Sequence, residues 1–191
     1  MNLIDRAKNI IANPRQEWLV IATETDTINS LLTKYVLPLS LLPAIGTILG
    51  SLIWSLGFTY GLVTAVIGII GTIISYYVGS YVVDALAPSF QSEKNINRSA
   101  QLIGYSWTPA LVAGFLGFIP VIGWLIMLAG WGYSAYVMYL GVTPVKKTPQ
   151  DRAVMYVVIA IIVVIAISAI FGFIIAAAIV RSMFTPHYYY P

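Results

Sequence analysis

The sequence contains no cysteine, only one histidine and only 17 charged residues, ten of them Lys or Arg and seven Asp or Glu, among 191. Without cysteine the chain can form neither a disulfide bond nor a thiolate metal site. The one histidine, His187, lies near the C-terminus, so we expect no serine–histidine pair within an apolar segment. The chain also lacks the HExxH, GxxxxGK, GxSxG and GxGxxG motifs. We therefore predict that it is not an enzyme and that it binds no cofactor and no metal ion.

Charged residues are missing from three long segments, 35–83, 99–145 and 153–180, of 49, 47 and 28 residues. A soluble domain carries charges throughout its surface, so these gaps exclude one, and with it a soluble nucleic-acid-binding protein. A helix needs about 20 apolar residues to cross the bilayer core. The first two gaps each accommodate two spans and a turn, and the third accommodates one. The sequence thus predicts an all-α integral membrane protein with five transmembrane helices in contact with the lipid bilayer.

The five spans are placed at residues 35–56, 61–86, 99–118, 121–140 and 153–180, which together form a transmembrane domain of residues 35–180. Residues 1–34 form a charged head before this domain, and residues 181–191 form an external tail. Three prolines within the spans each remove a backbone hydrogen bond and are expected to kink their helices, namely Pro38, Pro43 and Pro109.

The head contains two short amphipathic segments. In the first, five apolar side chains fall on one helical face: Leu3, Ile4, Ala7, Ile10 and Ile11. We expect this helix to lie on the membrane surface. A second helix is expected to start at Pro14, with Trp18, Ile21 and Ala22 as an interfacial face.

Lys and Arg are distributed unequally between the two sides of the predicted bundle. Four lie in the head, two in the loop 93–98 and three in the loop 146–152, whereas Arg181 alone lies on the other side. Membrane proteins retain Lys and Arg in their cytoplasmic loops. The pattern therefore predicts a cytoplasmic N-terminus and an external C-terminus. It also explains the net charge of +3 without a nucleic acid or another acidic partner.

Small residues recur in pairs along the spans: Gly46 and Gly50, Gly68 and Gly71, Ser75 and Gly79, and Gly130 and Gly132. Membrane helices associate by close packing, which small residues permit. We interpret these pairs as contacts within one bundle, and a homodimer interface is the alternative.

Asp84 is the only acidic residue within a predicted span, near the cytoplasmic end of the second one. Burying an acid in a membrane is costly, so such a residue is a functional candidate by default. The alternative interpretation is that Asp84 lies at headgroup level, where it caps or hydrogen-bonds a neighbouring helix. Tyr77 and Tyr81 precede it on the same helical face.

Nine of the 13 tyrosines fall in the cytoplasmic halves of the predicted spans. Tyrosine is common at membrane interfaces, so ordinary interfacial anchoring explains most of them. The sharper hypothesis is a polar vestibule between the second, third and fourth spans, lined by tyrosines such as Tyr133 and Tyr136 and with Asp84 at its rim.

Two segments resemble the signature stretches of the Yip-domain family, whose usual forms are DLYGP and GYxxxP. The first is Asp84-Ala85-Leu86-Ala87-Pro88, which keeps the aspartate and the proline. The second is Gly104-Tyr105-Ser106-Trp107-Thr108-Pro109, which keeps the glycine, the tyrosine and the proline. The resemblance implies a five-span membrane protein and adds Pro88, Gly104, Tyr105 and Pro109 to the candidate binding residues Tyr77, Tyr81, Asp84, Tyr133 and Tyr136.

Two further segments are similar to the prokaryotic branch of that family: Asn13-Pro14 with Glu17-Trp18, and Thr143-Pro144 with Thr148-Pro149 and Asp151-Arg152. Eukaryotic members bind Rab GTPases at Golgi and endoplasmic reticulum membranes. A prokaryotic member implies a plasma membrane.

Two functional hypotheses follow. The first is a non-enzymatic membrane organiser or adaptor, which recruits a cytoplasmic protein partner or shapes the bilayer through its cytoplasmic face. The second is a small-solute permease or channel that uses Asp84 and the tyrosines. Five spans are few for alternating access, so the second hypothesis requires a dimer.

Overall fold

The structure is a computed structural model that describes the backbone of residues 2–184 and the side chains of residues 2–170. No strand occurs in that part of the chain. Its elements, in order, are α1 (Leu3–Ala12), α2 (Pro14–Thr23), α3 (Ile28–Leu31), the π-helical turn η1 (Leu32–Val36), α4 (Leu37–Ile53), α5 (Phe58–Leu86), the 3₁₀ turn η2 (Ala87–Phe90), α6 (Ile96–Ser106), α7 (Thr108–Phe115), the 3₁₀ turn η3 (Leu116–Phe118), α8 (Ile122–Lys146) and α9 (Gln150–Phe184). The tail lies largely outside the described residues. The predicted all-α class is confirmed.

Four helical segments are long and apolar enough to cross a membrane: Ile28–Ile53, Phe58–Phe90, Ile122–Lys146 and Gln150–Ile170. They correspond to the first, second, fourth and fifth predicted spans. The first begins seven residues earlier than predicted, because Thr27 caps α3 by accepting a hydrogen bond from the Ser30 amide at 3.2 Å. From there α3, η1 and α4 continue as one helix through Pro43.

The third predicted span, 99–118, is not one helix but two shorter ones, α6 and α7, separated at Trp107. Pro109 cannot donate the hydrogen bond that the Tyr105 carbonyl would receive in a continuous helix. The Thr108 hydroxyl donates to this carbonyl instead, at 2.7 Å. The Ala110 amide is satisfied by Ser134 of α8, 3.1 Å away. The proline thus breaks the helix, as its position predicts, while two side chains satisfy the backbone groups set free.

Several of the small residues do bring helices together within the chain. A Cβ atom at Gly46 of α4 would lie 2.5 Å from the Phe115 carbonyl oxygen of α7, and one at Gly130 of α8 would lie 2.5 Å from Ala113. Gly68, Gly71 and Gly132 behave differently, because a Cβ atom there would meet nothing within 4 Å. The interpretation of the glycine pairs as intramolecular contacts therefore holds for the first pair and for Gly130, but not for these three.

We expect Gly46→Leu to lower the free energy of unfolding by about 2 kcal/mol, because the added side chain collides with the α7 backbone. Gly132→Leu is the matched control, since its side chain enters open space. The measurement is thermal unfolding of the purified protein in detergent. Equal stability of the two variants would contradict the packing of α4 against α7.

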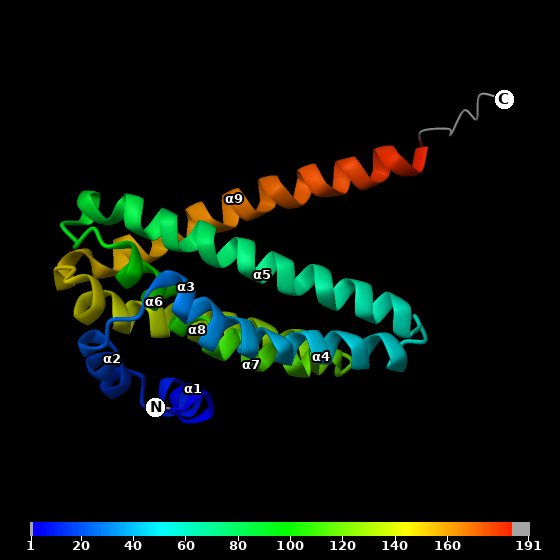
Figure 1. Ribbon diagram of the computed structural model, residues 1–191, viewed down its shortest axis with the longest axis horizontal. Helices are drawn as coiled ribbons and strands as arrows, with labels where there is room; N and C mark the ends of the chain where they lie inside the picture. Colours follow the sequence, from blue (N-terminus) through cyan, green and yellow to red (C-terminus); the bar gives the residue numbers. More distant parts are fainter. Residues whose placement is uncertain (1, 185–191) are drawn as a thin grey trace.

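The head packs against the end of the bundle (Figure 1). Ala7 and Ile10 of α1 are buried within the protein, whereas Ile4, assigned to the same lipid-facing side, is 61% exposed. Trp18 of α2 is 1% exposed, and its indole donates a hydrogen bond to the Val137 carbonyl of α8 at 2.9 Å. The bundle itself therefore buries the apolar face that the sequence pattern assigned to lipid.

Candidate functional site

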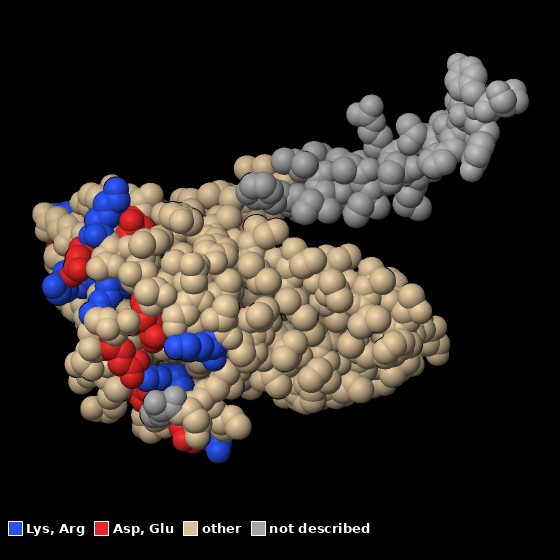
Figure 2. All heavy atoms as spheres, in the orientation of Figure 1, with Lys and Arg blue, Asp and Glu red and all other residues tan. Residues whose placement is uncertain are grey.

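Charged side chains gather at one end of the molecule, and Figure 2 shows them there on the visible face. This end, which we call the polar cap, comprises α1, α2, residues 24–27, the loop 91–95 with the start of α6, and the turn 146–150. Apart from Asp84 near the end of α5 and Lys146 at the end of α8, the helices α4, α5, α7 and α8 carry no charge. Both family-like segments, around Asp84 and around Tyr105, adjoin the polar cap. It is therefore the candidate functional site.

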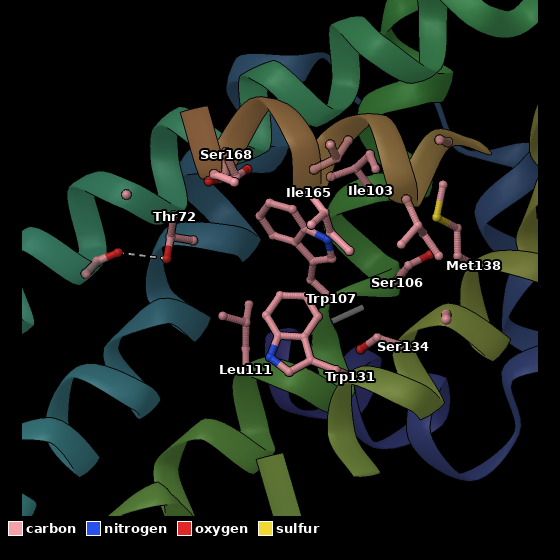
Figure 3. A pocket seen from close by; sticks show the side chains of 18 residues that line it. Thr72, Ile103, Ser106, Trp107, Leu111, Trp131, Ser134, Met138, Ile165 and Ser168 are labelled. Atoms are coloured by element: carbon pink, nitrogen blue, oxygen red, sulfur yellow. Dashed lines mark hydrogen bonds between the residues drawn. The ribbon is translucent and has the colours of Figure 1, made fainter. Parts of the chain in front are cut away.

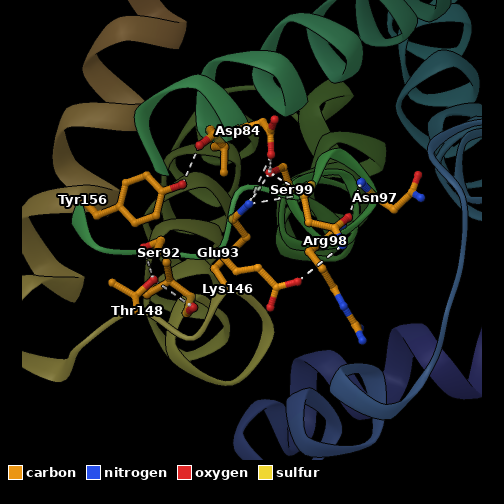
Figure 4. A network of polar contacts seen from close by, with 12 residues as sticks. Asp84, Ser92, Glu93, Asn97, Arg98, Ser99, Lys146, Thr148 and Tyr156 are labelled. Atoms are coloured by element: carbon orange, nitrogen blue, oxygen red, sulfur yellow. Dashed lines mark hydrogen bonds and ion pairs between the residues drawn. The ribbon is translucent and has the colours of Figure 1, made fainter. Parts of the chain in front are cut away.

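Asp84, at the end of α5, belongs to a buried polar network with α6 and α8 (Figure 4). The Lys146 ammonium lies 3.4 Å from the Asp84 carboxylate and 2.6 Å from the Ser99 hydroxyl, and it also donates to the Asn95 carbonyl at 3.3 Å. Ser99 donates to Asp84 at 3.1 Å. The Lys146 side chain is completely buried. Asp84 thus hydrogen-bonds a neighbouring helix, which is the geometry of the alternative interpretation, and it has an ionic partner as well.

The arrangement around Lys146 satisfies all three ammonium protons. A buried ion pair is tolerated only when additional hydrogen bonds compensate for the lost hydration of both charges. The contacts with Asp84, Ser99 and Asn95 supply this compensation. The pair therefore fixes the ends of α5, α6 and α8 relative to one another.

A second layer of contacts surrounds this network. Tyr156 of α9 donates to the Val83 carbonyl at 2.5 Å, and the hydroxyls of Ser92 and Thr148 lie 2.7 Å apart. At the surface, the Lys147 ammonium lies 2.8 Å from the Glu93 carboxylate and holds the pKa of that carboxyl below its ordinary value through the hydrogen bond. These contacts add α9 and the loop 91–95 to the elements held together at the cap.

Arg6 of α1 organises a second polar cluster. Its guanidinium pairs with Glu17 at 2.5 Å and with Glu24, and it lies 5.4 Å from the centre of the Tyr105 ring. Arg6 and Glu17 are each 5% exposed. A guanidinium over an aromatic face is attracted by the ring's quadrupole. The tyrosine of the GYxxxP-like segment thus contacts the head directly.

The other side of Tyr105 faces the membrane helices. The Tyr35 ring packs edge-on at 4.7 Å, and the Tyr35 hydroxyl lies 2.7 Å from that of Thr108. Because Thr108 gives its hydrogen to the Tyr105 carbonyl, Tyr35 is the donor in this second contact. Gly104, the preceding residue, allows close approach, since a Cβ atom there would lie 3.0 Å from Val36. This segment therefore joins the head to the point where the third predicted span breaks.

The linker between α2 and α3 is held by α6. Arg98 donates to the Glu24 carbonyl at 2.9 Å, and the Gln101 amide donates to the same carbonyl at 3.1 Å. Asn97 accepts from the Ile28 amide at 3.0 Å. With the Arg6 ion pairs, these contacts connect the head to the membrane helices through buried polar groups as well as through Trp18.

The structure does not bring the predicted tyrosines into one vestibule. Tyr77 donates to Asn29, whereas Tyr81 is 62% exposed and Tyr136 is 44% exposed. Tyr133 donates to the Ile11 carbonyl of α1 at 2.8 Å, and its ring lies 5.8 Å from that of Tyr136. Pro88 lies exposed in η2, and Pro109 is buried at the start of α7. The nine predicted residues are thus divided between the Asp84 network, the Arg6 cluster and separate positions along the helices.

The central residues of the two clusters, Lys146, Ser99 and Arg6, are not among the site residues predicted from the sequence. Lys146 directly follows a charge-free segment, next to Lys147, and the sequence pattern assigns both to a solvated loop. The only sequence signal for the Asp84–Lys146 pair is that both residues lie near the predicted cytoplasmic surface of the membrane. Arg6 belongs to the polar face of an amphipathic helix. A polar face is ordinarily solvated, so the sequence pattern does not indicate that Arg6 pairs with an acidic residue of α2.

Comparison with known proteins identifies one family. The model of the Yip1 domain matches residues 8–180 of the chain. The matched range contains α2 to α8 in full and both family-like segments. Comparisons with curated proteins and with solved structures gave no match.

Proposed function

Because this chain belongs to the Yip1 domain family, we propose that it is a non-enzymatic membrane organiser or adaptor that acts through its polar cap. The cap lies on the cytoplasmic side of a plasma membrane in this proposal, with the C-terminus outside. The distribution of Lys and Arg supports the orientation, since all but Arg181 belong to the cap or to the helix ends beside it.

One observation carries the proposal, the outer surface of the head. While α1 and α2 bury one face against the bundle, their other face leaves three apolar side chains exposed: Ile4 at 61%, Leu19 at 57% and Val20 at 47%. The basic side chains of Lys8 and Arg15 lie exposed beside them. Exposed apolar side chains with basic neighbours are typical of surfaces that engage a protein partner or lipid headgroups. Since the head is fixed to the bundle, whatever binds this surface is held at the membrane.

A permease that uses Asp84 is less well supported. Ser99 and Lys146 both engage the Oδ1 oxygen of Asp84, and the side chain is only 14% exposed, so little of the carboxylate is left to meet a solute. The flux of small solutes in proteoliposomes, compared between the native protein and Asp84→Asn, would reveal such an activity.

We expect the double variant Leu19→Ser, Val20→Ser to lose most of its cytoplasmic crosslinks or vesicle remodelling while its melting temperature stays unchanged, because both side chains are exposed and support no packing. The measurements are proximity crosslinking in the native membrane and electron microscopy of vesicles containing the purified protein. Gln16→Ser, at an exposed polar position of the same helix, is the matched control. Absence of both crosslinks and remodelling with the native protein would refute the proposal.

A further inference from the structure

A polar crevice of about 420 Å³ lies where the head meets the start of the first span. It is bounded by α1, by residues 23–26 and by the part of α3 and η1 that carries Ser30 and Lys34. Arg6 and Tyr105 also line it, and they are only 5% and 4% exposed. Lys34 is exposed and is the last charged residue before the charge-free segment 35–83. The crevice therefore combines polar groups that the fold buries with a cation at the edge of the apolar part of the bundle.

Two charged side chains of the crevice, Lys34 and Asp26, have no ion-pair partner among the described residues. Arg6 and Glu24, which line the same crevice, pair with each other. The Tyr105 hydroxyl donates to the Asp26 carboxylate at 3.4 Å, which is longer than the usual range of about 2.5–3.0 Å for such a bond. Within the described chain, the crevice thus leaves one cation and one anion available to a bound molecule.

The two available charges follow the order of the charges in a phospholipid headgroup. Asp26 precedes the first span, whereas Lys34 lies seven residues beyond the capping residue Thr27, which places its backbone about 10 Å closer to the bilayer core along the helix axis. The long lysine side chain can extend back toward the headgroups. In a phospholipid the phosphate is attached to the glycerol, and an amine lies beyond the phosphate, further from the core. Lys34 is therefore placed for a phosphate and Asp26 for an amine.

Apolar surface is available on several helices and does not by itself select a lipid. Beyond Lys34, α4 exposes Leu41 at 49% and Ile45 at 47%, where acyl chains can lie. The groove between α5, α8 and α9 is also open to the bilayer, since Trp131 and Ile165 of its walls are 53% and 61% exposed (Figure 3). No charged residue lines that groove, so it accepts any acyl chain. Selection among headgroups therefore depends on charged sites such as the crevice.

A second polar crevice, of about 210 Å³, lies beside α6 and the end of α8. Its two basic side chains are engaged within the chain: Lys147 pairs with Glu93 at 2.8 Å, and Arg98 donates to the Glu24 carbonyl at 2.9 Å. Asp26 lines this crevice too, but among the described residues no unpaired cation accompanies it there. Of the two crevices, only the first offers both charges to a bound molecule.

From these observations we propose that the first crevice binds the headgroup of a phospholipid of the ethanolamine class. The lipid phosphate lies against the Lys34 ammonium, and the lipid ammonium donates hydrogen bonds to the Asp26 carboxylate and to the Tyr105 hydroxyl oxygen. A choline headgroup carries the same charges but has no N–H to donate, and a glycerol headgroup brings no cation to Asp26. The proposal does not depend on the adaptor role, which uses other residues of the head.

The test is native mass spectrometry of the purified protein in mixed micelles that contain equal amounts of phosphatidylethanolamine, phosphatidylcholine and phosphatidylglycerol with identical acyl chains. We expect one phosphatidylethanolamine per chain to be retained several-fold more than either other lipid. Retention should fall stepwise when the amine carries one, two and three methyl groups, because each methyl group removes an N–H donor.

Variants of the two available charges assign the selection to the crevice. Lys34→Ala should lower retention of phosphatidylethanolamine several-fold, while Lys34→Arg, which keeps the charge, should preserve it. Asp26→Asn should abolish the preference over phosphatidylglycerol. Neither Lys34→Ala nor Asp26→Asn should change the melting temperature in lipid-free detergent, because neither side chain has an ion-pair partner within the described chain. Lys94→Ala and Asp151→Asn are the matched controls, since both residues are exposed outside the crevice, and they should leave retention unchanged.

Equal retention of the three lipids by the native protein would overturn the proposal. A loss in Lys94→Ala as large as that in Lys34→Ala would also overturn it, because the surface charge of the cap as a whole would then attract the lipid. Soluble glycerophosphoethanolamine carries the same charged groups without acyl chains, and we expect it to displace the lipid only at much higher concentration. Displacement at equal concentration would overturn the assignment to a lipid and identify the crevice as a site for a soluble amine phosphate.

Discussion

Replacing Lys146 by methionine is expected to lower the free energy of unfolding by about 3 kcal/mol, the cost of leaving one member of a buried ion pair without its partner. Lys146 is completely buried, and Asp84, only 14% exposed, would keep just the Ser99 hydroxyl as a hydrogen-bond donor. The measurement is unfolding in mixed micelles with increasing denaturing detergent. Lys147→Met is the matched control, because Lys147 is 78% exposed and pairs with Glu93 at the surface. Its expected cost is within about 1 kcal/mol.

The double variant Asp84→Asn, Lys146→Met separates the ion pair from the packing around it. Replacing both members of a buried pair by neutral groups of similar volume is often neutral or stabilising. We therefore expect the double variant to regain most of the stability lost in Lys146→Met, which gives a large coupling energy in the double-mutant cycle. Independent, additive losses would contradict a direct interaction between the two residues.

The same variant distinguishes a structural from a functional Asp84. If the carboxylate only fixes α5 to α6 and α8, the stable double variant keeps the crosslinks and vesicle remodelling of the native protein. If Asp84 itself engages a partner, the variant is stable but loses them. The two outcomes decide between the interpretations that the position of Asp84 in the sequence leaves open.

The spans could be predicted from the sequence because the bilayer imposes a simple rule on composition. The charge-free segments 35–83, 99–145 and 153–180 fix the number of apolar helices to within one. Pro109 also indicates where the third of them is disturbed. The helix can break completely because the side chains of Thr108 and Ser134 satisfy the backbone groups that the break sets free. Of these two contacts, only that of Ser134 joins helices distant in sequence.

The cap could be predicted only in part. Asp84, Gly104 and Tyr105 were found because they belong to family-like segments or interrupt an apolar run. Lys146 and Arg6 were missed because their burial results from contacts between separate helices, and a basic residue at a helix end is ordinarily solvated. A helix with one apolar face is equally compatible with lipid and with protein, so the pattern of the head does not reveal what covers it.

Trp18 provides the clearest test of what covers the head. Its indole is 1% exposed, and it packs so closely on α8 that a Cβ atom at Gly141 would lie 2.4 Å from the ring. It also contacts the Tyr105 ring edge-on, with 6.3 Å between centres. Truncation of a buried tryptophan costs about 3–5 kcal/mol. We expect Trp18→Ala to lose stability of this size and to release α1 and α2 from the bundle.

Two measurements follow that release, the melting temperature in detergent and the rate at which a protease added to detergent-solubilised protein cleaves the segment between α2 and α3. The protease should act faster on Trp18→Ala, because Arg98 and Gln101 hold the Glu24 carbonyl only while the head is docked. Trp124→Ala is the control, since that tryptophan is 57% exposed on the apolar surface. Gly141→Leu, which leaves Trp18 intact but fills its position on α8, should reproduce the effect. A head bound to the membrane surface would instead leave melting temperature and cleavage unchanged in both variants, because its tryptophan would then contact lipid and not α8.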